Sequence, residues 1–200
     1  MAPPWNGSTF PIRVLPTIRS DPVNPMSRPN TLLIALLGTC IASVAHAQAK
    51  TDYALNGDQV RFHVPADWTA IMEKADGNPQ AVAFQVPDSS AQGSEDAANV
   101  TVKTRELKDP SGFAASVQEE FERSKAQGGY ENDPSNKDPA IHQYFVVRGK
   151  TKYLVRDSFQ LSGSIAVEVR CQRPLLATTP AAWNAEFDKA CGAVVASLKH

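Results

Sequence analysis

Residues 164–171 read Ser-Ile-Ala-Val-Glu-Val-Arg-Cys, and the strict alternation of apolar and polar side chains in this stretch decides the fold. A period of two residues predicts a β-strand with one buried face. Two further strand-like segments, 141–148 and 152–161, precede it. The turns Gly149-Lys150 and Ser162-Gly163 separate the three segments. Tight turns of this kind join antiparallel neighbours, so the three segments predict a β-meander.

Three shorter strands are predicted upstream of this meander. Residues 60–64 alternate between apolar and polar side chains, residues 81–86 are mostly apolar, and residues 100–104 alternate again. A proline directly follows each of the first two segments, and it ends a strand because its nitrogen has no hydrogen to donate to a sheet. An additional N-terminal strand is predicted near residues 53–56.

Two helices are predicted, one on each side of the meander in the sequence. The first begins at Asp109-Pro110-Ser111, where the aspartate can cap the helix and the proline suits its first turn, and it ends at Gly128-Gly129. The second begins at Thr179-Pro180 and continues to Leu198 with apolar residues at helical spacing. The element order β-β-β-α-β-β-β-α predicts an α+β fold: an antiparallel six-stranded sheet with helices packed on its faces, or α/β/α sandwich.

Residues 26–47 have the three-part order of a secretory signal peptide. A short basic region at Arg28 precedes an apolar run of about 14 residues, and Ala45-His46-Ala47 places small residues at the −3 and −1 positions of a cleavage site. We therefore predict cleavage between Ala47 and Gln48 and export to a bacterial periplasm. The apolar run is too short for a membrane-spanning helix, which needs roughly 20 residues.

Two further predictions concern the N-terminal region. Residues 1–25 contain six prolines and no sustained apolar pattern, so we predict a disordered, non-native extension before a true start at Met26. Leu37-Gly38-Thr39-Cys40 loosely resembles a lipobox, which leaves lipidation at Cys40 open as an alternative to simple cleavage. Residues 48–200 are predicted to form a single domain, since this length is sufficient for one core.

The predicted mature chain is nearly neutral. Without Arg13, Arg19, Arg28 and Asp21 it keeps 17 basic and 20 acidic side chains, a formal charge of −3. A chain with this balance of charges has no excess of positive charge with which to attract nucleic acid or anionic lipid. We therefore expect no nucleic-acid partner. Once the signal peptide is cleaved, no stable membrane insertion is expected either.

Two of the three cysteines remain after the predicted cleavage, Cys171 and Cys191. Cys171 lies on the apolar face of its predicted strand and Cys191 on the apolar stripe of the second predicted helix, so both are expected to point toward the core. An even pair in an exported domain predicts a disulfide. Two separate buried thiols are the alternative. A bridge that closes a loop of about 20 residues contributes roughly 3 kcal/mol in the chain-entropy model.

The chain resembles the Mog1/PsbP-like group of α/β/α sandwiches, which includes bacterial proteins of the DUF1795 type and the periplasmic lipoprotein DcrB. The resemblance covers most of residues 53–199. It rests on the opening strand that ends in Phe62-His63-Val64-Pro65-Ala66-Asp67-Trp68, on the Phe113–Lys125 helix, on the meander, and on a closing helix that ends in Ala196-Ser197-Leu198-Lys199. It implies an antiparallel sheet with helices on its faces and a non-enzymatic role in binding or assembly. The group has no common catalytic motif to carry over.

No residue pattern in the predicted mature chain indicates catalysis, a metal site or a cofactor. There is no nucleophile elbow, no zinc-binding spacing of histidines or cysteines and no calcium loop. His63 and His142 lie on predicted strand faces opposite apolar neighbours and are expected in solvent. Trp68, at a strand end, and Trp183, at the head of an apolar stripe, are interpreted as packing residues, with ligand binding as the alternative.

The polar faces of the predicted strands carry a mixed-charge strip with one aromatic residue, which we call the docking strip: Tyr144, Arg148, Arg156, Glu168 and Arg170. If no helix covers that side, the docking strip is predicted to bind a protein partner. An ordinary solvated sheet face is the alternative.

The sequence therefore predicts an exported, non-catalytic protein-binding or assembly factor of the cell envelope. One alternative is a periplasmic immunity or inhibitor protein against a secreted toxin or a cell-wall hydrolase. The other alternative is an enzyme with an unrecognised site.

Overall fold

The computed structural model describes residues 49–88, 90 and 97–198 of the chain. The predicted N-terminal extension, the signal peptide, the cleavage site and Cys40 lie outside these residues. Ala45–His200 form one compact unit, which contains all the helices and strands below. In the described part of the chain, no helix has the length and apolar character needed to cross a membrane.

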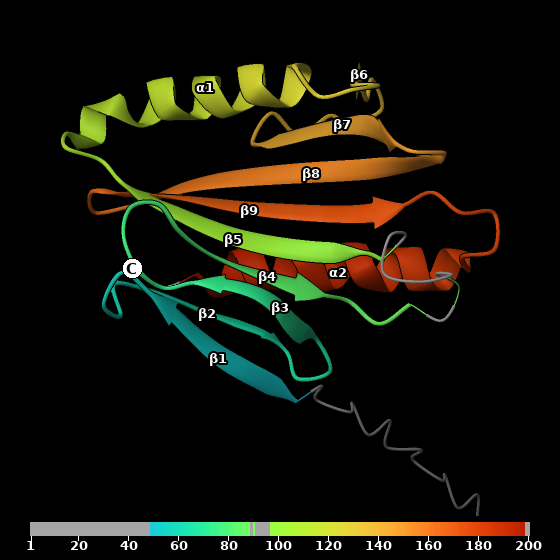
Figure 1. Cartoon of the computed structure of the whole chain (residues 1–200), viewed down its shortest axis with the longest axis horizontal. Coiled ribbons are helices and arrows are strands. Elements are labelled where there is room, and N and C mark those ends of the chain that lie inside the picture. The colour runs from blue at the N-terminus through green and yellow to red at the C-terminus, as the bar shows by residue number, and fades with distance from the viewer. Residues whose placement is uncertain (1–48, 89, 91–96, 199–200) are drawn as a thin grey trace, which may run out of the picture. The chain divides into compact units, whose positions relative to one another are not determined.

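A seven-stranded antiparallel sheet forms the centre of this unit (Figure 1). Across the sheet the order is β3-β4-β5-β9-β8-β7-β6, so the last strand of the chain lies beside β5 in the middle. The strands are β3 (Thr69–Lys74), β4 (Gln80–Gln85), β5 (Asn99–Glu106), β6 (Glu131–Asn132), β7 (Ile141–Arg148), β8 (Thr151–Ser162) and β9 (Ile165–Pro174).

Two helices and a separate hairpin complete the fold. They are α1 (Phe113–Lys125), which follows the short 3-10 helix η2 (Pro110–Gly112), α2 (Ala181–Ser197), and the two-stranded sheet of β1 (Lys50–Leu55) and β2 (Val60–Pro65). The predicted start of the first helix is confirmed, because the Asp109 carboxylate accepts a hydrogen bond from the Ser111 backbone N–H at 2.9 Å.

The α+β class and the antiparallel sheet are confirmed, whereas the predicted number of six strands is wrong by one. β2, predicted as part of the main sheet, pairs instead with β1, because the left-handed turn at Asn56-Gly57-Asp58 folds these two strands onto each other. β3 was not predicted, since all six of its residues are exposed and its sequence therefore lacks a buried face. β6 has two residues, too few to show a period.

The two helices cover opposite faces of the sheet, and in Figure 1 α2 lies behind the strands. Residues paired in register share a face. Val102 pairs with Val169, and the neighbouring Lys103 pairs with Glu168 on the other face. The valine face forms the main core with α2, whereas Lys103 on the charged face reaches Glu120 of α1. Helix α1 comes to lie there because it connects β5, in the middle of the sheet, to the far edge at β6.

The predicted disulfide is confirmed. Cys171 of β9 is bonded to Cys191 of α2, with 6.2 Å between the two Cα atoms. Both cysteines are buried in the main core. The bond therefore ties α2 covalently to the central strand of the sheet, on the face where the apolar side chains lie.

Candidate functional site

Three of the five residues of the docking strip lie beneath α1. Tyr144 is fully buried, Glu168 is 6% exposed, and the side chain of Arg170 keeps 25% of its exposure. The docking prediction required a sheet face that no helix covers. Helix α1 covers this face, so these residues do not form an exposed docking surface.

The other two residues of the docking strip lie apart from these. Arg156 pairs in register with Cys171, so it shares the α2 face, where its guanidinium is 3.9 Å from the Asp188 carboxylate. Arg148 is exposed at the end of β7, with its guanidinium carbon 5.6 Å from the centre of the Tyr153 ring. The docking strip is thus corrected: its members come from two faces and from different depths. The alternation of apolar and polar residues shows which side chains share a face within one strand. Which faces of neighbouring strands coincide depends on the register between the strands, and the sequence does not show that register.

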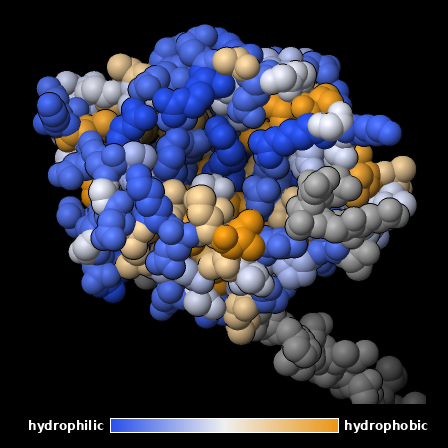
Figure 2. Space-filling model, in the orientation of Figure 1, coloured by the Kyte–Doolittle hydropathy of each residue, from blue (hydrophilic) through white to orange (hydrophobic). Residues whose placement is uncertain are grey.

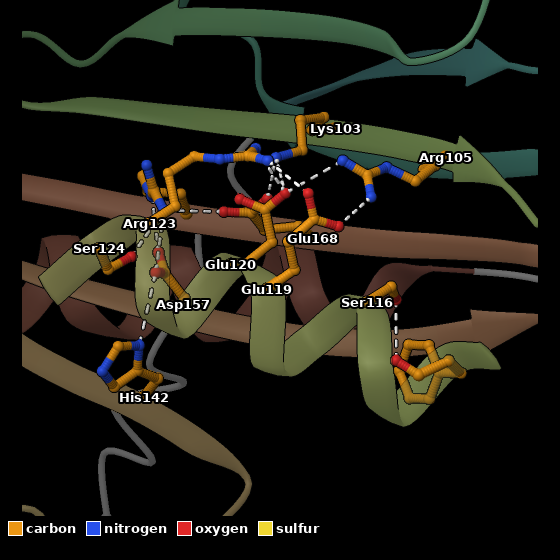
Figure 3. Close-up of polar contacts among 12 residues, drawn as sticks. Lys103, Arg105, Ser116, Glu119, Glu120, Arg123, Ser124, His142, Asp157 and Glu168 are labelled. Atoms are coloured by element: carbon orange, nitrogen blue, oxygen red, sulfur yellow. Dashed lines mark hydrogen bonds and ion pairs between the residues drawn. The ribbon is translucent and has the colours of Figure 1, made fainter. Parts of the chain in front are cut away.

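Acidic and basic side chains form a continuous network beneath α1, which we call the α1 network (Figure 3). Arg170 joins its two ends, because its guanidinium lies 3.0 Å from Glu168 and 2.8 Å from Asp157. Lys103 Nζ of β5 lies 2.9 Å from Glu120 Oε1 of α1 and 2.6 Å from Glu168 Oε2 of β9. The Glu120 carboxylate also lies 2.9 Å from Arg123 and 3.6 Å from Arg105. Glu120 is only 6% exposed, so water screens these charges weakly. The α1 network therefore fixes the helix on the sheet.

The buried end of the α1 network is centred on Asp157, which is inaccessible to solvent. Arg170 binds its carboxylate with two hydrogen bonds, of 2.8 Å from Nε and 3.1 Å from Nη2. The Tyr144 hydroxyl donates to Asp157 Oδ2 at 3.2 Å. Burial raises the pKa of the Asp157 carboxyl, and the hydrogen bonds from Arg170 oppose this rise. Burial, with the charge of Asp157 nearby, raises the pKa of Tyr144 to about 12, so its hydroxyl remains a donor at neutral pH.

His142 lies at the edge of the same network, and the expectation that it is in solvent is wrong. Its side chain is 9% exposed and its ring centre lies 4.1 Å from that of Phe121 of α1. Its Nε2 lies 3.2 Å from the Tyr130 hydroxyl. Burial, helped by the positive charge of Arg170, lowers the pKa of His142. The imidazole is therefore neutral at neutral pH and packs as an aromatic ring.

The hollow that touches the α1 network, beside Lys103 and Glu168, measures about 20 Å³. A general acid or base must come within hydrogen-bond reach of a substrate, and this volume admits none. In the parts of the chain that the structure describes, no group of three or more histidine, cysteine, aspartate or glutamate side chains could hold a metal ion. The arrangement of the α1 network is thus suited to holding a helix in place.

A groove of about 560 Å³ lies on the α2 side of the sheet, bounded by α2, by the end of β2 and by the residues after β4. We call it the α2 groove. Small-molecule sites commonly have volumes of roughly 300–1,000 Å³. The apolar residues that line it are Ala49, Val64, Pro65, Trp68, Val86, Pro87, Trp183, Phe187, Ala190, Ala193 and Val194. The charged residues at its rim are Lys50, Asp67, Glu186 and Lys189.

Two tryptophans give the α2 groove its aromatic wall. Trp183 stacks on Phe187 with ring centres 5.5 Å apart, and its indole N–H donates to the Pro87 carbonyl at 3.0 Å. Trp68 is 8% exposed and tilts against Phe84 in the main core, with ring centres 6.4 Å apart. Both tryptophans pack, as the sequence predicted, and both also line the groove. The indoles are thus held in fixed positions, which makes the wall pre-formed.

His63 belongs to the same groove and is half-buried there, so the expectation of a solvated side chain is only partly met. Its imidazole pairs with the carboxylate of Asp52 on β1. Its backbone N–H donates to the Ser197 hydroxyl of α2 at 2.9 Å. This residue therefore joins the hairpin to the end of the helix and helps to close one side of the α2 groove.

The α2 groove as a whole was not predicted, because its residues come from both ends of the domain. Trp68 precedes the sheet and Trp183 follows it, and nothing in the local sequence of either shows that they meet. One sequence feature does point to the groove: a tryptophan lies at the end of a predicted strand, Trp68, and another lies at the start of a predicted helix, Trp183. An indole at an element end can pack with one side and leave another open.

No family model and no curated protein matches the chain, so its membership of the DUF1795 type stays a prediction. Solved structures do match. One is a protein of Bacteroides thetaiotaomicron, with 18% identity and a TM-score of 0.48. The match covers 76% of this chain and 48% of that one, so this chain spans about half the length of the Bacteroides protein.

Two other solved structures come from the group that the sequence resembles. The Ran-binding protein Mog1p of Saccharomyces cerevisiae has 11% identity and a TM-score of 0.47, over 76% of this chain and 96% of Mog1p. Cyanobacterial PsbP from Synechocystis has 16% identity and a TM-score of 0.44, and the match covers 82% of this chain and 98% of PsbP. This chain is similar in fold to both. The likeness concerns the fold, and it assigns no partner or activity to this chain.

Proposed function

We propose that this chain is an exported, non-catalytic binding protein of the bacterial cell envelope that holds an apolar segment of a partner protein in the α2 groove. The observation that carries the proposal is the groove itself: about 560 Å³ of open volume with a pre-formed aromatic wall. Pockets with mostly apolar walls and a few polar groups at the rim are the usual binding sites of proteins.

The charges at the rim favour a peptide over a strongly charged ligand. The rim carries two basic residues, Lys50 and Lys189, and two acidic residues, Asp67 and Glu186. A highly anionic or cationic ligand would meet like charges there, which costs affinity. A polypeptide segment with apolar side chains and a neutral backbone meets no such repulsion. Its side chains can bury against Trp183 and its backbone can stay at the polar rim.

The non-catalytic part of the proposal is supported by the placement of the titratable groups. The buried acids of the α1 network are ion-paired beneath a helix, next to a hollow of about 20 Å³. His142 is stacked on Phe121 and hydrogen-bonded to Tyr130. These groups have structural partners, and the groove that is large enough for a ligand has walls of apolar side chains.

Export is supported by two features of the chain. Residues 26–47 have the order of a signal peptide, and the Cys171–Cys191 disulfide suits an oxidising compartment. N-terminal sequencing of the protein recovered from the periplasm of a bacterial host tests this point. We expect a chain that begins at Gln48. A lipidated chain that begins at Cys40, or an uncleaved chain in the cytoplasm, would contradict it.

Selection of displayed random peptides on immobilised Ala45–His200, with its disulfide intact, tests the binding site. We expect peptides with two or more large apolar residues to be enriched. Ala193→Arg places a long charged side chain at an exposed position of the groove wall and should weaken the selected peptides by about tenfold or more. Ala196→Arg, an exposed position on the same helix outside the groove lining, is the matched control and should leave binding unchanged.

Two outcomes would contradict the proposed site. One is the absence of any enriched apolar sequence. The other is enrichment of peptides that bind the Ala193→Arg variant and the unmodified unit equally well.

A further inference from the structure

β3 ends the main sheet on one side and leaves its outer edge open. Among the described residues, its backbone pairs only with β4, and all six of its residues are exposed. Ile71 and Met72, at its centre, are 56% and 47% exposed and are the two most exposed large apolar side chains in the described part of the chain. Figure 2 shows apolar surface over β3 within a largely hydrophilic face.

An open edge of this kind has backbone N–H and C=O groups ready to pair with another strand. Proteins usually protect such edges with charges, prolines or bulges. β3 carries Glu73 and Lys74, and its register with β4 shifts by one residue between Ala70 and Met72. The bulge interrupts the ladder with β4, but it leaves Ile71 and Met72 uncovered.

The sequence of β3 is self-complementary in one antiparallel register. When two copies meet about a two-fold axis between Ile71 and Met72, each Ile71 lies opposite the Met72 of the other copy. The charged residues then lie opposite small neutral ones, Glu73 opposite Ala70 and Lys74 opposite Thr69. The bulge makes this register possible, because it places Ala70 and Glu73 on one face of the sheet, with Phe84 and Val82, and Thr69 and Lys74 on the other face, with Gln85 and Ala81. In a parallel in-register pairing, Glu73 would lie beside Glu73 and Lys74 beside Lys74, which is destabilising.

We propose that β3 is the contact through which two copies of this chain form a dimer, with Ile71 of each copy packed against Met72 of the other in a continuous antiparallel sheet. A two-fold contact of this kind uses the same surface on both copies and closes after two. The opposite edge of the sheet is the two-residue β6, which is too short to propagate the pairing. The arrangement therefore stops at a dimer and does not grow into a filament.

The dimer leaves the α2 groove available, and the inference is independent of the proposed function. None of the β3 residues lines the groove. If no peptide binds, the dimer proposal still stands. If the protein is a monomer, the peptide-binding proposal still stands.

Sedimentation equilibrium of Ala45–His200 over a range of concentrations tests the dimer. We expect twice the monomer mass at high concentration. Ile71→Lys should raise the dissociation constant by more than about tenfold, because each copy loses a buried apolar side chain and gains a charge at the contact. Leu175→Lys, at an apolar residue that is 40% exposed outside β3, is the matched control and should leave the mass unchanged. A monomer at all concentrations, or a dimer that Ile71→Lys does not weaken, would overturn the proposal.

A cross-linking experiment tests the register. The two native cysteines of the unit are joined to each other, so an introduced cysteine is the only free thiol. Single variants Ala70→Cys and Glu73→Cys are mixed and mildly oxidised. Directly opposite residues lie about 5 Å apart and can form a disulfide, whereas residues three places apart along a strand lie about 10 Å apart and cannot. We expect cross-linked heterodimers from the mixture and none from either variant alone. Equal cross-linking in all three samples would overturn the register.

Discussion

The two faces of the central sheet are each covered by one helix, but different forces hold the two helices. Helix α2 packs on a face of valines and is tied to it by the Cys171–Cys191 disulfide. Helix α1 lies on a face that carries many charged and hydroxyl-bearing residues, where it is held by the α1 network and by the ring of Phe121, which packs against Phe159 and His142. One architecture thus tolerates two quite different kinds of helix contact.

The difference matters because the two kinds of contact respond differently to change. Apolar packing is non-directional, and its loss scales with the area that is removed. An ion-pair network in a buried site depends on every partner, because a charge that loses its partner there remains desolvated. We therefore expect the α1 side to react sharply to single substitutions that leave a buried charge unpaired. The α2 side should react more gradually and can accommodate a groove.

The largest effect is expected from Asp157→Ala, which removes both hydrogen bonds from Arg170 to this carboxylate and leaves the guanidinium with Glu168, at 3.0 Å, as its remaining carboxylate partner. Removing one partner of a buried ion pair costs about 3–5 kcal/mol in the free energy of unfolding. Urea denaturation of Ala45–His200 measures it. The double variant Asp157→Leu/Arg170→Met, which replaces both charges by apolar groups, should recover most of the loss. A single variant as stable as the unmodified unit would contradict the role given to this pair.

The second largest effect on the free energy of unfolding is expected from removal of the Cys171–Cys191 disulfide on the α2 side. Cys171→Ala/Cys191→Ala should lower the free energy of unfolding by about 3 kcal/mol, because the unfolded chain regains the freedom of a loop of 20 residues. The same urea denaturation checks this value. Addition of a reducing agent to the unmodified unit should give a similar loss. It should leave the double alanine variant unchanged, since that variant has no bond to reduce.

A pH dependence is expected from His142. Its folded-state pKa lies below the ordinary value of 6.5, first because of burial and then because of the charges of Arg170 and Lys125. The stability that this histidine contributes is therefore fully present above pH 6.5 and is lost as the pH falls through its lowered folded-state pKa. Stability measured from pH 7.5 to pH 5 should fall relative to that of His142→Phe, which keeps the ring stacked on Phe121 and cannot titrate. Parallel curves for the two proteins would contradict the assigned pKa direction.

The smallest effect is expected at the exposed margin of the α1 network. Glu119 lies 2.8 Å from Arg105 and 3.0 Å from Arg123, but just over half of its side chain is exposed. Hydrogen bonds and charge from Arg105 lower the pKa of Glu119, yet water and salt screen such surface pairs. Glu119→Gln should therefore leave the denaturation midpoint almost unchanged, in contrast to Asp157→Ala. A large loss would show that the two ends of the network are energetically coupled.

The same contrast explains how much of the molecule its sequence predicts. The meander, both helices and the disulfide were predictable, because each depends on a period or a spacing within one segment. The burial of Tyr144 and Arg170 beneath α1 was not predictable in the same way. Polar strand residues that alternate with apolar ones look alike whether water or a charged helix covers them. Glu120 of α1, buried among basic residues, is the partner that decides between the two.

β3, at the edge of the sheet, and the α2 groove were not predicted, for other physical reasons. β3 has no buried face, so Ile71 and Met72 produce no amphipathic period. The groove depends on Trp68 and Trp183, which only the complete tertiary fold brings to one cavity. A sequence period reports what lies within one element, and these features are made between elements.

We assign binding to the α2 side of the sheet and a structural role to the α1 side. Calorimetric titration of a selected apolar peptide into two matched variants distinguishes the roles of the two sides. Ala193→Arg lies on α2 in the groove wall, and Ala115→Arg occupies an exposed position on α1. We predict that Ala193→Arg weakens binding by about tenfold or more while Ala115→Arg leaves it unchanged. Loss of binding in Ala115→Arg with full binding in Ala193→Arg would show that the peptide binds on the α1 side.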